Sequence, residues 1–166
     1  MSLKQIEANT LTFNPFEKLS KQWALVSAGS LDKFNMMTVS WGAVGVIWGK
    51  PSATVYIRHS RYTKEFVDAG DTFVLTFLKD GHRDALNTLG SKSGRDMDKM
   101  RASGLTPAVV DGGVTFEEAE LVLVCRKRMV QRMEENLIPP DVREKWYEGD
   151  YHTMYWGEIV EALVKA

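Results

Sequence analysis

The chain has 166 residues and a mass of 18.8 kDa, enough to bury about 70% of the surface that its unfolded form exposes. One core, and one domain over residues 1–166, are therefore expected. The sequence has 21 Lys and Arg against 22 Asp and Glu, so its formal net charge is −1. This balance gives no general attraction to nucleic acid or to an anionic membrane surface, and neither partner is expected.

The thiol and imidazole content argues against a metal site. Cys125 is the only cysteine, which excludes an intrachain disulfide and a site of several thiolates. It lies in an apolar, strand-like run and is interpreted as a small buried residue rather than a nucleophile. The histidines His59, His82 and His152 lack ligand-like spacing. Residues Met1 to Thr10 contain no apolar signal core, so a cytoplasmic location is expected.

Apolar and β-branched runs predict strands in the first half of the chain. They are Trp23–Ser30, Met37–Trp48 and Ala53–Ile57. Polar or Gly-containing segments between them, Leu31–Asn35 and Gly49–Pro51, are expected to form turns. The interval is typical of consecutive hairpins.

The second half mixes short helices with further strands. A helix is predicted at Arg61–Ala69, and Lys79–Gly104 is expected to be largely irregular, with one or two helical turns around Leu86. Pro139–Asp141 opens a last short helix. Further strands are predicted at Thr72–Leu78, Thr106–Val110, Ala119–Met129 and His152–Val164. Six or seven strands joined by short connections favour an α+β fold with an antiparallel β-barrel core.

The first segment with chemical content is Asn35–Trp41, where amide, hydroxyl and aromatic groups gather at one end of a predicted strand. Thr38 and Ser40 point to one face because side chains alternate along a strand. They are typical of a solvent-facing strand edge. With free backbone N–H groups beside them, they also suit the carbonyl edge of a flat heterocycle.

Two further segments are rich in cations and hydroxyls. Arg58–Lys64 runs from a strand into a predicted helix start, where unpaired N–H groups favour anions. Cations disfavour a helix start, so their presence is easier to explain if a phosphate binds there; solvated surface charge is the alternative. The polar loop Ser91–Arg95 could fold over the same phosphate.

Four segments together resemble the flavin reductase-like family of FMN-binding split barrels. They are Asn35–Gly42, Arg58–Thr63, Ser93–Lys99 and His152–Ile159, in this order along the chain. The resemblance implies an antiparallel Greek-key split β-barrel with a few short helices. It also implies a homodimer and FMN held near the subunit interface.

The resemblance assigns roles to individual residues. It places the isoalloxazine against the Asn35–Trp41 segment and the ribityl phosphate against the second segment and the loop after it. His152 matches a residue whose role varies in relatives, catalytic or structural. The cofactor-binding residues that we expect on this basis are Asn35, Met36, Met37, Thr38, Ser40, Trp41, Arg58, Ser60, Arg61, Tyr62, Thr63, Lys92, Ser93 and Arg95.

The function that the resemblance implies is an FMN-dependent oxidoreductase in which NADH or NADPH passes hydride to the flavin. The alternatives are a flavoredoxin-like electron carrier reduced by a protein partner, and a barrel that binds no flavin. A monooxygenase that receives the reduced flavin is a further conceivable partner. Trp41, Trp48 and the Met36–Met37 pair are candidates for the apolar surface of a dimer.

Overall fold

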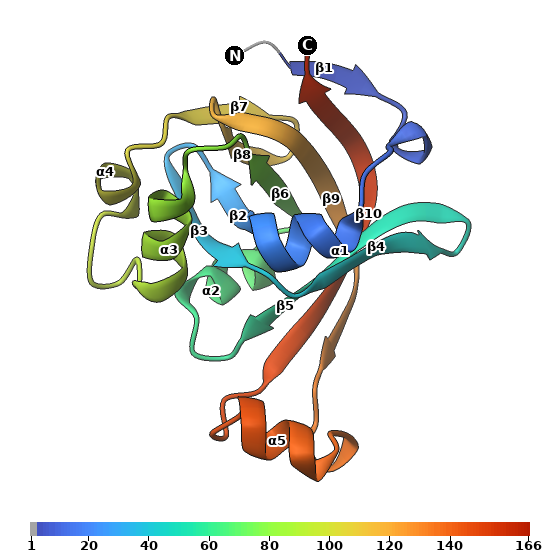
Figure 1. Cartoon of the computed structure of the whole chain (residues 1–166), viewed down its shortest axis with the longest axis vertical. Coiled ribbons are helices and arrows are strands. Elements are labelled where there is room, and N and C mark those ends of the chain that lie inside the picture. The colour runs from blue at the N-terminus through green and yellow to red at the C-terminus, as the bar shows by residue number, and fades with distance from the viewer. Residues whose placement is uncertain (1–2) are drawn as a thin grey trace.

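The computed structural model describes residues 3–166 and is built around one antiparallel sheet (Figure 1). Its strands follow the order β3-β2-β6-β9-β10-β5-β4, and β1 pairs with β10 beside this path. A separate hairpin joins β7 to β8. The strands are β1 (Leu3–Ile6), β2 (Ala24–Ser30), β3 (Lys33–Val39), β4 (Gly42–Ile47), β5 (Lys50–Arg58), β6 (Thr72–Leu78), β7 (Pro107–Val110), β8 (Gly113–Phe116), β9 (Ala119–Arg132) and β10 (His152–Lys165).

Helices are short and gather mainly beside β2 and β3 (Figure 1). The α-helices are α1 (Pro15–Glu17), α2 (Tyr62–Ala69), α3 (Arg83–Ser91), α4 (Lys99–Ser103) and α5 (Pro140–Trp146). Single turns of other helix types are η1 (Ala8–Thr10), η2 (Lys18–Gln22) and η3 (Glu135–Leu137). In the described part of the chain, no helix is long and apolar enough to cross a membrane.

The single strand predicted from Met37 to Trp48 is wrong. The structure breaks it at Ser40 and Trp41, and the two halves, β3 and β4, lie at opposite ends of the strand order. The break lets the chain pass from one end of the coiled sheet to the other, where β3 approaches β5. A continuous strand could not do this, because one strand has only two neighbours in a sheet.

Other predicted boundaries are closer to the structure. The expected turn at Leu31–Asn35 is shorter, since β3 already begins at Lys33, and Pro51 lies inside β5. The helix predicted at Arg61–Ala69 is confirmed as α2, with Arg61 in extended conformation at its N-cap. The Lys79–Gly104 connection is more ordered than expected and contains both α3 and α4.

The core fills the inside of the coiled sheet. Phe73, Phe77 and Tyr155 are fully buried there, and each such side chain contributes about 1.5–3 kcal/mol to folding. Gly157 faces this core at a bulge of β10, where an added Cβ would lie 2.6 Å from Cys125 Cβ. The absence of a side chain therefore allows β10 to pack against β9. Cys125 itself is fully buried, and burial raises the pKa of its thiol, as expected for a packing residue.

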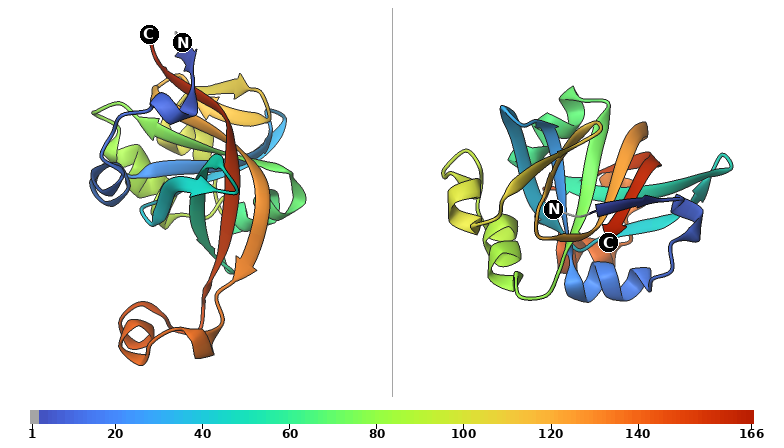
Figure 2. Two further views of the ribbon diagram at one scale, coloured as in Figure 1. Left: turned by 90° about the vertical axis from the view of Figure 1, so that its right-hand side faces the viewer. Right: turned by 90° about the horizontal axis from the view of Figure 1, so that it is seen from above.

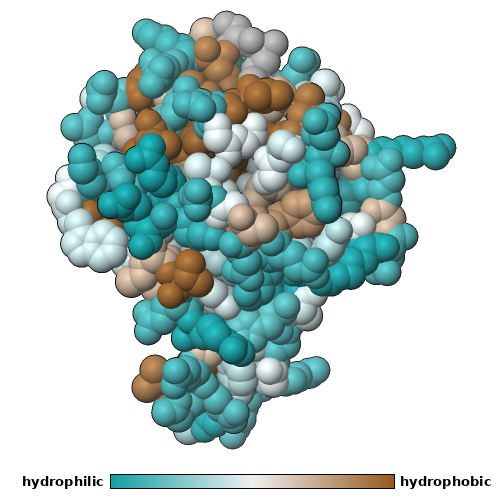
Figure 3. All heavy atoms as spheres, turned by 180° about the vertical axis from the view of Figure 1, so that it is seen from behind, coloured by the Kyte–Doolittle hydropathy of each residue, from teal (hydrophilic) through white to brown (hydrophobic). Residues whose placement is uncertain are grey.

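The ends of β9 and β10 extend beyond the sheet body as an arm that carries η3 and α5 (Figures 1 and 2). We call residues 132–151 the arm. Seen from behind, its surface is mostly hydrophilic, whereas hydrophobic residues gather on the upper part of the body (Figure 3). At the opposite pole, β1 lies beside the C-terminal end of β10, with which it pairs.

Candidate functional site

Three neighbouring cavities follow β3 and the start of α2. The first, the strand cavity, has a volume of about 190 Å³ and lies between β3, β5 and β10. Strand register builds it, because His152 of β10 pairs with Arg58 of β5. It is lined by Met37, Thr38, Val39, Ser40, Trp41, Tyr56, Arg58, Arg61 and His152.

The second, the cation cavity, has a volume of about 200 Å³ and lies at the N-terminus of α2. The loop after α3 and the first residue of α4 close it. It is lined by Ser60, Arg61, Tyr62, Thr63, Ser91, Lys92, Ser93 and Lys99. Arg61 lines both cavities and therefore lies at their junction.

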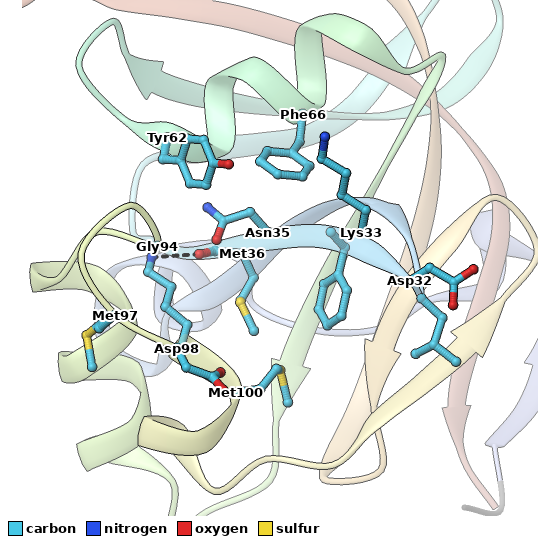
Figure 4. Close-up of a pocket in the computed structure, with 13 residues that line it drawn as sticks. Asp32, Lys33, Asn35, Met36, Tyr62, Phe66, Gly94, Met97, Asp98 and Met100 are labelled. Carbon is cyan, nitrogen blue, oxygen red and sulfur yellow. Dashed lines mark hydrogen bonds between the residues drawn. The ribbon is translucent and has the colours of Figure 1, made fainter.

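The third, the turn cavity, has a volume of about 320 Å³ and lies beneath the β2–β3 turn (Figure 4). It shares Tyr62 and Lys99 with the cation cavity. Asn35 and Gly94 both line the turn cavity and lie close together: an added Cβ on Gly94 would lie 2.4 Å from Asn35 Oδ1. Any larger residue at position 94 would require the Asn35 side chain to move.

Two polar side chains of the strand cavity, Thr38 and Arg58, are hydrogen-bonded to backbone carbonyls of the protein. The Thr38 hydroxyl donates to the Leu86 carbonyl at 2.6 Å. The Arg58 guanidinium donates to two carbonyls of the arm, of Trp146 at 2.8 Å and of Asp150 at 3.2 Å. Thr38 and Arg58 are thus held in place by contacts within the protein.

His152 sits at the mouth of the strand cavity among aromatic rings. Its Nδ1 shares a hydrogen bond of 2.9 Å with the Tyr147 hydroxyl, and its ring centre lies 5.2 Å from that of Trp41. Burial, and then the nearby Arg58 charge, lower the pKa of His152 to about 4. The imidazole is therefore neutral at pH 7.

Arg61 is the least satisfied cation of the site. Its Nη2 is buried, and no hydrogen-bond partner for it occurs within residues 3–166. Burial and the Arg58 charge lower the pKa of its guanidinium, although arginine stays protonated. A buried, unpartnered donor costs about 1–3 kcal/mol. An anion in the adjoining cavity would relieve this cost.

Lys99 is a second cation of the cation cavity, and its side chain is buried. It is 5% exposed, and its Nζ donates to the carbonyls of Met36 at 2.8 Å and Leu89 at 3.1 Å. Burial, and then the Arg61 charge, lower the pKa of Lys99 to about 8. No carboxylate forms a salt bridge with it in the described part of the chain.

The remaining contacts fix the start of α2. Asn35 Nδ2 donates to Thr63 Oγ1 at 2.8 Å, and both side chains are buried. Ser60 donates through its N–H (3.2 Å) and its hydroxyl (2.5 Å) to the carboxylate of Asp150. A carboxylate of the arm thus accepts both donors of Ser60, a residue expected near phosphate.

The structure brings most residues of the predicted site to the first two cavities. Three lie elsewhere: Asn35 and Met36 line the turn cavity, and Arg95 donates to the Ser60 carbonyl and pairs with Glu65. Met36 and Met37 are buried in the monomer, so the expectation that they form a dimer surface is wrong. Trp41 and Trp48 are exposed, as that expectation requires.

Sequence reasoning missed several residues of the site. Lys99 stands in a polar segment, where only its place in the family motif singles it out. Trp146 meets Trp41 edge to face at 5.2 Å, and Tyr147 holds His152. Both belong to the arm, whose return to the site is a tertiary feature without a local sequence signal.

Comparison with known proteins identifies the class. The model of the flavin reductase like domain family matches residues 16–166. The chain therefore belongs to this family. No curated protein matches the sequence.

Solved structures share the fold. An FMN-binding domain of a flavin reductases-like enzyme from Shewanella baltica OS155 has a TM-score of 0.70 and 18% identity, covering 99% of this chain and 78% of that chain. Flavoredoxin from Methanosarcina acetivorans has a TM-score of 0.66 and 22% identity, covering 85% and 67%. The NADH:FAD oxidoreductase SgcE6 of Streptomyces globisporus C-1027 has a TM-score of 0.62 and 17% identity, covering 85% and 77%. The expected antiparallel split-barrel fold is confirmed.

Proposed function

We propose that the chain is an FMN-dependent oxidoreductase of the flavin reductase type that uses NADH or NADPH as hydride donor. The observation that carries the proposal is Arg61, which lines both cavities and whose buried Nη2 has no hydrogen-bond partner among residues 3–166. FMN has a flat ring at one end and a phosphate at the other. The strand cavity and the cation cavity offer these two chemistries in adjoining spaces.

The cation cavity suits the phosphate. The half-buried Arg61, the buried Lys99 and the exposed Lys92 line it together with the hydroxyls of Thr63 and Ser93. Charge-assisted hydrogen bonds from such groups to phosphate are stronger than neutral ones. The N-terminus of α2 adds a partial positive charge. Ser60 and Arg58 are left out of this proposed phosphate site, because the Asp150 carboxylate lies beside Ser60 and the Arg58 guanidinium is bonded to the arm.

The strand cavity suits the isoalloxazine ring. Its walls are apolar at Met37 and aromatic at Trp41, with hydroxyls at Thr38 and Ser40. When bound, FMN supplies the hydride acceptor. The protein positions the ring and excludes water from one of its faces. It also keeps His152 uncharged, so this imidazole can form hydrogen bonds without placing a positive charge beside the ring.

The test is reconstitution with FMN, followed by anaerobic addition of NADH or NADPH. We expect a yellow complex whose flavin absorbance bleaches with either donor. Flavin binding without bleaching would contradict the proposed enzyme activity and favour a flavoredoxin-like carrier. The flavin of such a carrier would instead be bleached by a reduced partner protein. Absence of flavin binding would overturn both.

We also propose a homodimer. Trp41, beside the strand cavity, and Trp48, at the tip of the β4–β5 hairpin, are 38% and 65% exposed. Apolar groups of this size beside an open cavity are typical of an interface. Light scattering of the FMN complex should give twice 18.8 kDa. A monomer with full FMN affinity would contradict the dimer.

A further inference from the structure

Helix α2 carries two of the proposed phosphate ligands, Arg61 and Thr63, at its N-terminal end, so the position of the helix decides where they lie. No side chain in the described part of the chain caps this N-terminus. The start of α2 is tied to β3 by the hydrogen bond from Asn35 to Thr63. One such tie leaves the direction of the helix open, and its other end must be fixed separately.

Tyr155 reaches that other end from the core. Its side chain on β10 is fully buried, and its hydroxyl donates to Asp68 Oδ1 at 2.6 Å. Burial, and then this hydrogen bond, raise the pKa of the hydroxyl, so it remains a donor at pH 7. Val67 of α2 is also fully buried, but apolar packing is non-directional. The hydrogen bond therefore fixes the position of the helix more closely than packing does.

Two lysines complete the contacts at this end of α2. Lys64 Nζ, one turn earlier on the helix, lies 2.6 Å from Asp68 Oδ2. Lys127 of β9 donates from Nζ to the carbonyls of Val67 at 2.6 Å and Asp68 at 3.0 Å, where the helix dipole favours a cation. Burial raises the pKa of Asp68, but hydrogen bonds from Lys64 and Tyr155 outweigh it and lower that pKa. The carboxylate is therefore ionised at pH 7.

We call Tyr155, Asp68, Lys64 and Lys127 the α2 anchor. None of the four lines the strand, cation or turn cavity. A helix of eight residues is marginal on its own, so its position depends on what holds its ends. Asp68 follows Thr63 by less than two helical turns. A shift at the anchor is therefore passed along a short, rigid segment to the wall of the cation cavity.

We propose that Tyr155 and Asp68 are positioning residues for the phosphate of FMN, because their hydrogen bond holds α2 where Arg61 and Thr63 face the cation cavity. The inference rests on the proposed function, since it needs a phosphate in that cavity. A binding site has to hold its groups to within about 0.5 Å. The Asp68 carboxylate thus favours an anion through geometry, although its own charge disfavours one.

This opposition of sign makes the test sharp. Tyr155→Phe removes the hydroxyl and keeps the ring, and Asp68→Ala removes the acceptor from a side chain that is 45% exposed, so both variants should fold. Fluorescence titration should show FMN affinity lowered about 3- to 10-fold in each, with riboflavin affinity within about 2-fold. If charge alone mattered, Asp68→Ala would strengthen FMN binding.

Two further variants separate the hydrogen bond from the charge. Asp68→Asn keeps an oxygen that can accept the Tyr155 hydroxyl, so it should keep FMN affinity within about 2-fold. The double variant of Tyr155→Phe with Asp68→Ala should lose no more than the larger single loss, because both changes break one link. Asp71→Ala removes a carboxylate from an exposed position just beyond α2 and should change FMN affinity by less than about 2-fold.

A control for general loosening comes from β6. Thr76→Val removes a buried hydroxyl bond of 2.8 Å to Thr115, at a place that lines none of the three cavities. It should lower the unfolding temperature, as Tyr155→Phe does, without a selective loss of FMN.

The outcomes against the inference differ from those against the proposed function. Equal changes for FMN and riboflavin in Tyr155→Phe and Asp68→Ala, no change, or a gain in FMN affinity would overturn the positioning role and leave FMN binding intact. The same selective loss in Thr76→Val would also overturn it, because general loosening would then account for the effect. Failure of the unmodified protein to bind any flavin would instead contradict the proposed function.

Discussion

The strand cavity and the cation cavity share Arg61 but are built in different ways. In the strand cavity, Thr38, Arg58 and His152 all have partners within the protein. In the cation cavity, the buried Nη2 of Arg61 has no hydrogen-bond partner in the described part of the chain, and Lys99 donates to two carbonyls and to no carboxylate there. One cavity is shaped in advance by the sheet and the arm; the other holds charge that an anion would stabilise.

The difference teaches which part of a ligand each cavity controls. A preformed, internally bonded wall selects shape, because its groups cost little to keep in place. An uncompensated buried cation selects charge, because its stabilisation depends on the ligand. Comparing FMN with riboflavin, which lacks the phosphate, therefore separates the two cavities by experiment.

The largest effect is expected from Arg61→Ala. Losing a charge-assisted hydrogen bond should weaken FMN binding by about 1.5–3 kcal/mol, roughly 10- to 150-fold. Riboflavin binding should change little, and removing a buried unpartnered group should not destabilise the apoprotein. Fluorescence titration of both flavins measures the first two effects, and thermal unfolding measures the third.

Arg101→Ala is the matched control, since it removes the same charge from an exposed position on α4 that does not line the cation cavity. It should reduce FMN affinity by less than about 2-fold. Equal losses at the two positions would mean that general electrostatic attraction, not a phosphate site, accounts for the Arg61 effect.

The next largest effect is a pH dependence of FMN affinity, which arises from Lys99 in the cation cavity. The pKa of Lys99 is lowered to about 8, so its charge is lost as pH rises through 8 in the apoprotein. A bound phosphate raises that pKa, and FMN affinity should therefore fall above pH 8, by at most about 10-fold per pH unit. Riboflavin affinity should stay flat, and Lys99→Met should flatten the FMN profile.

The apoprotein should respond in the opposite direction. Because the folded-state pKa of Lys99 lies below its value of 10.5 in the unfolded chain, the unfolded state binds more protons between these pH values. The free energy of unfolding should then rise with pH from 8 to 10.5. A stability that falls over this range in the unmodified protein but not in Lys99→Met would contradict the lowered pKa.

Arg58 tests whether the strand cavity and the cation cavity differ as described. The sequence predicts that Arg58→Ala weakens FMN and spares riboflavin, as for a phosphate ligand. In the structure its guanidinium instead bonds the arm carbonyls of Trp146 and Asp150. We therefore expect similar losses for both flavins, about 3- to 10-fold, since two hydrogen bonds that hold the arm over the strand cavity disappear. A selective loss of FMN affinity, with riboflavin affinity unchanged, would show instead that Arg58 binds the phosphate.

These contacts show what a sequence can and cannot predict here. The β5–α2 passage was predictable, because a β-branched strand, a cation-rich cap and a helical apolar spacing follow one another in Ala53–Ala69. Most residues around the first two cavities were also identified. The resemblance also divides them between ring and phosphate, and the proposed function keeps this division except at Ser60 and Arg58, whose contacts to the arm depend on tertiary structure.

Features that depend on contacts between distant parts of the chain could not be predicted from the sequence. Nothing in Met37–Trp48 marks the break at Ser40, since β-branched residues continue on both sides; the break follows from the placing of β3 and β4 at opposite ends of the sheet. Burial of Lys99 was equally hidden, because a lysine in a polar segment is normally solvated. Its ammonium group is buried because it bonds carbonyls of both β3 and α3, which are far apart in the sequence.

The smallest expected effect concerns His152, which the resemblance left between a catalytic and a structural role. Burial and Arg58 lower the pKa of its imidazole to about 4, so the ring stays neutral from pH 5 to 8. A group that does not titrate cannot impose an inflection on the rate of flavin reduction over that range. Stopped-flow bleaching should therefore give a flat profile for the unmodified protein and for Tyr147→Phe, which removes the hydrogen bond to Nδ1. His152→Gln should lower the rate by less than about 10-fold, since it keeps a neutral hydrogen-bonding group. The unfolded histidine takes up a proton near pH 6.5 while the folded one does not, so stability should fall as pH drops from 6.5 towards 4 and should fall less in His152→Gln. An inflection near pH 6.5 that disappears in His152→Gln would show instead that the imidazole titrates in the working site and acts as a proton donor.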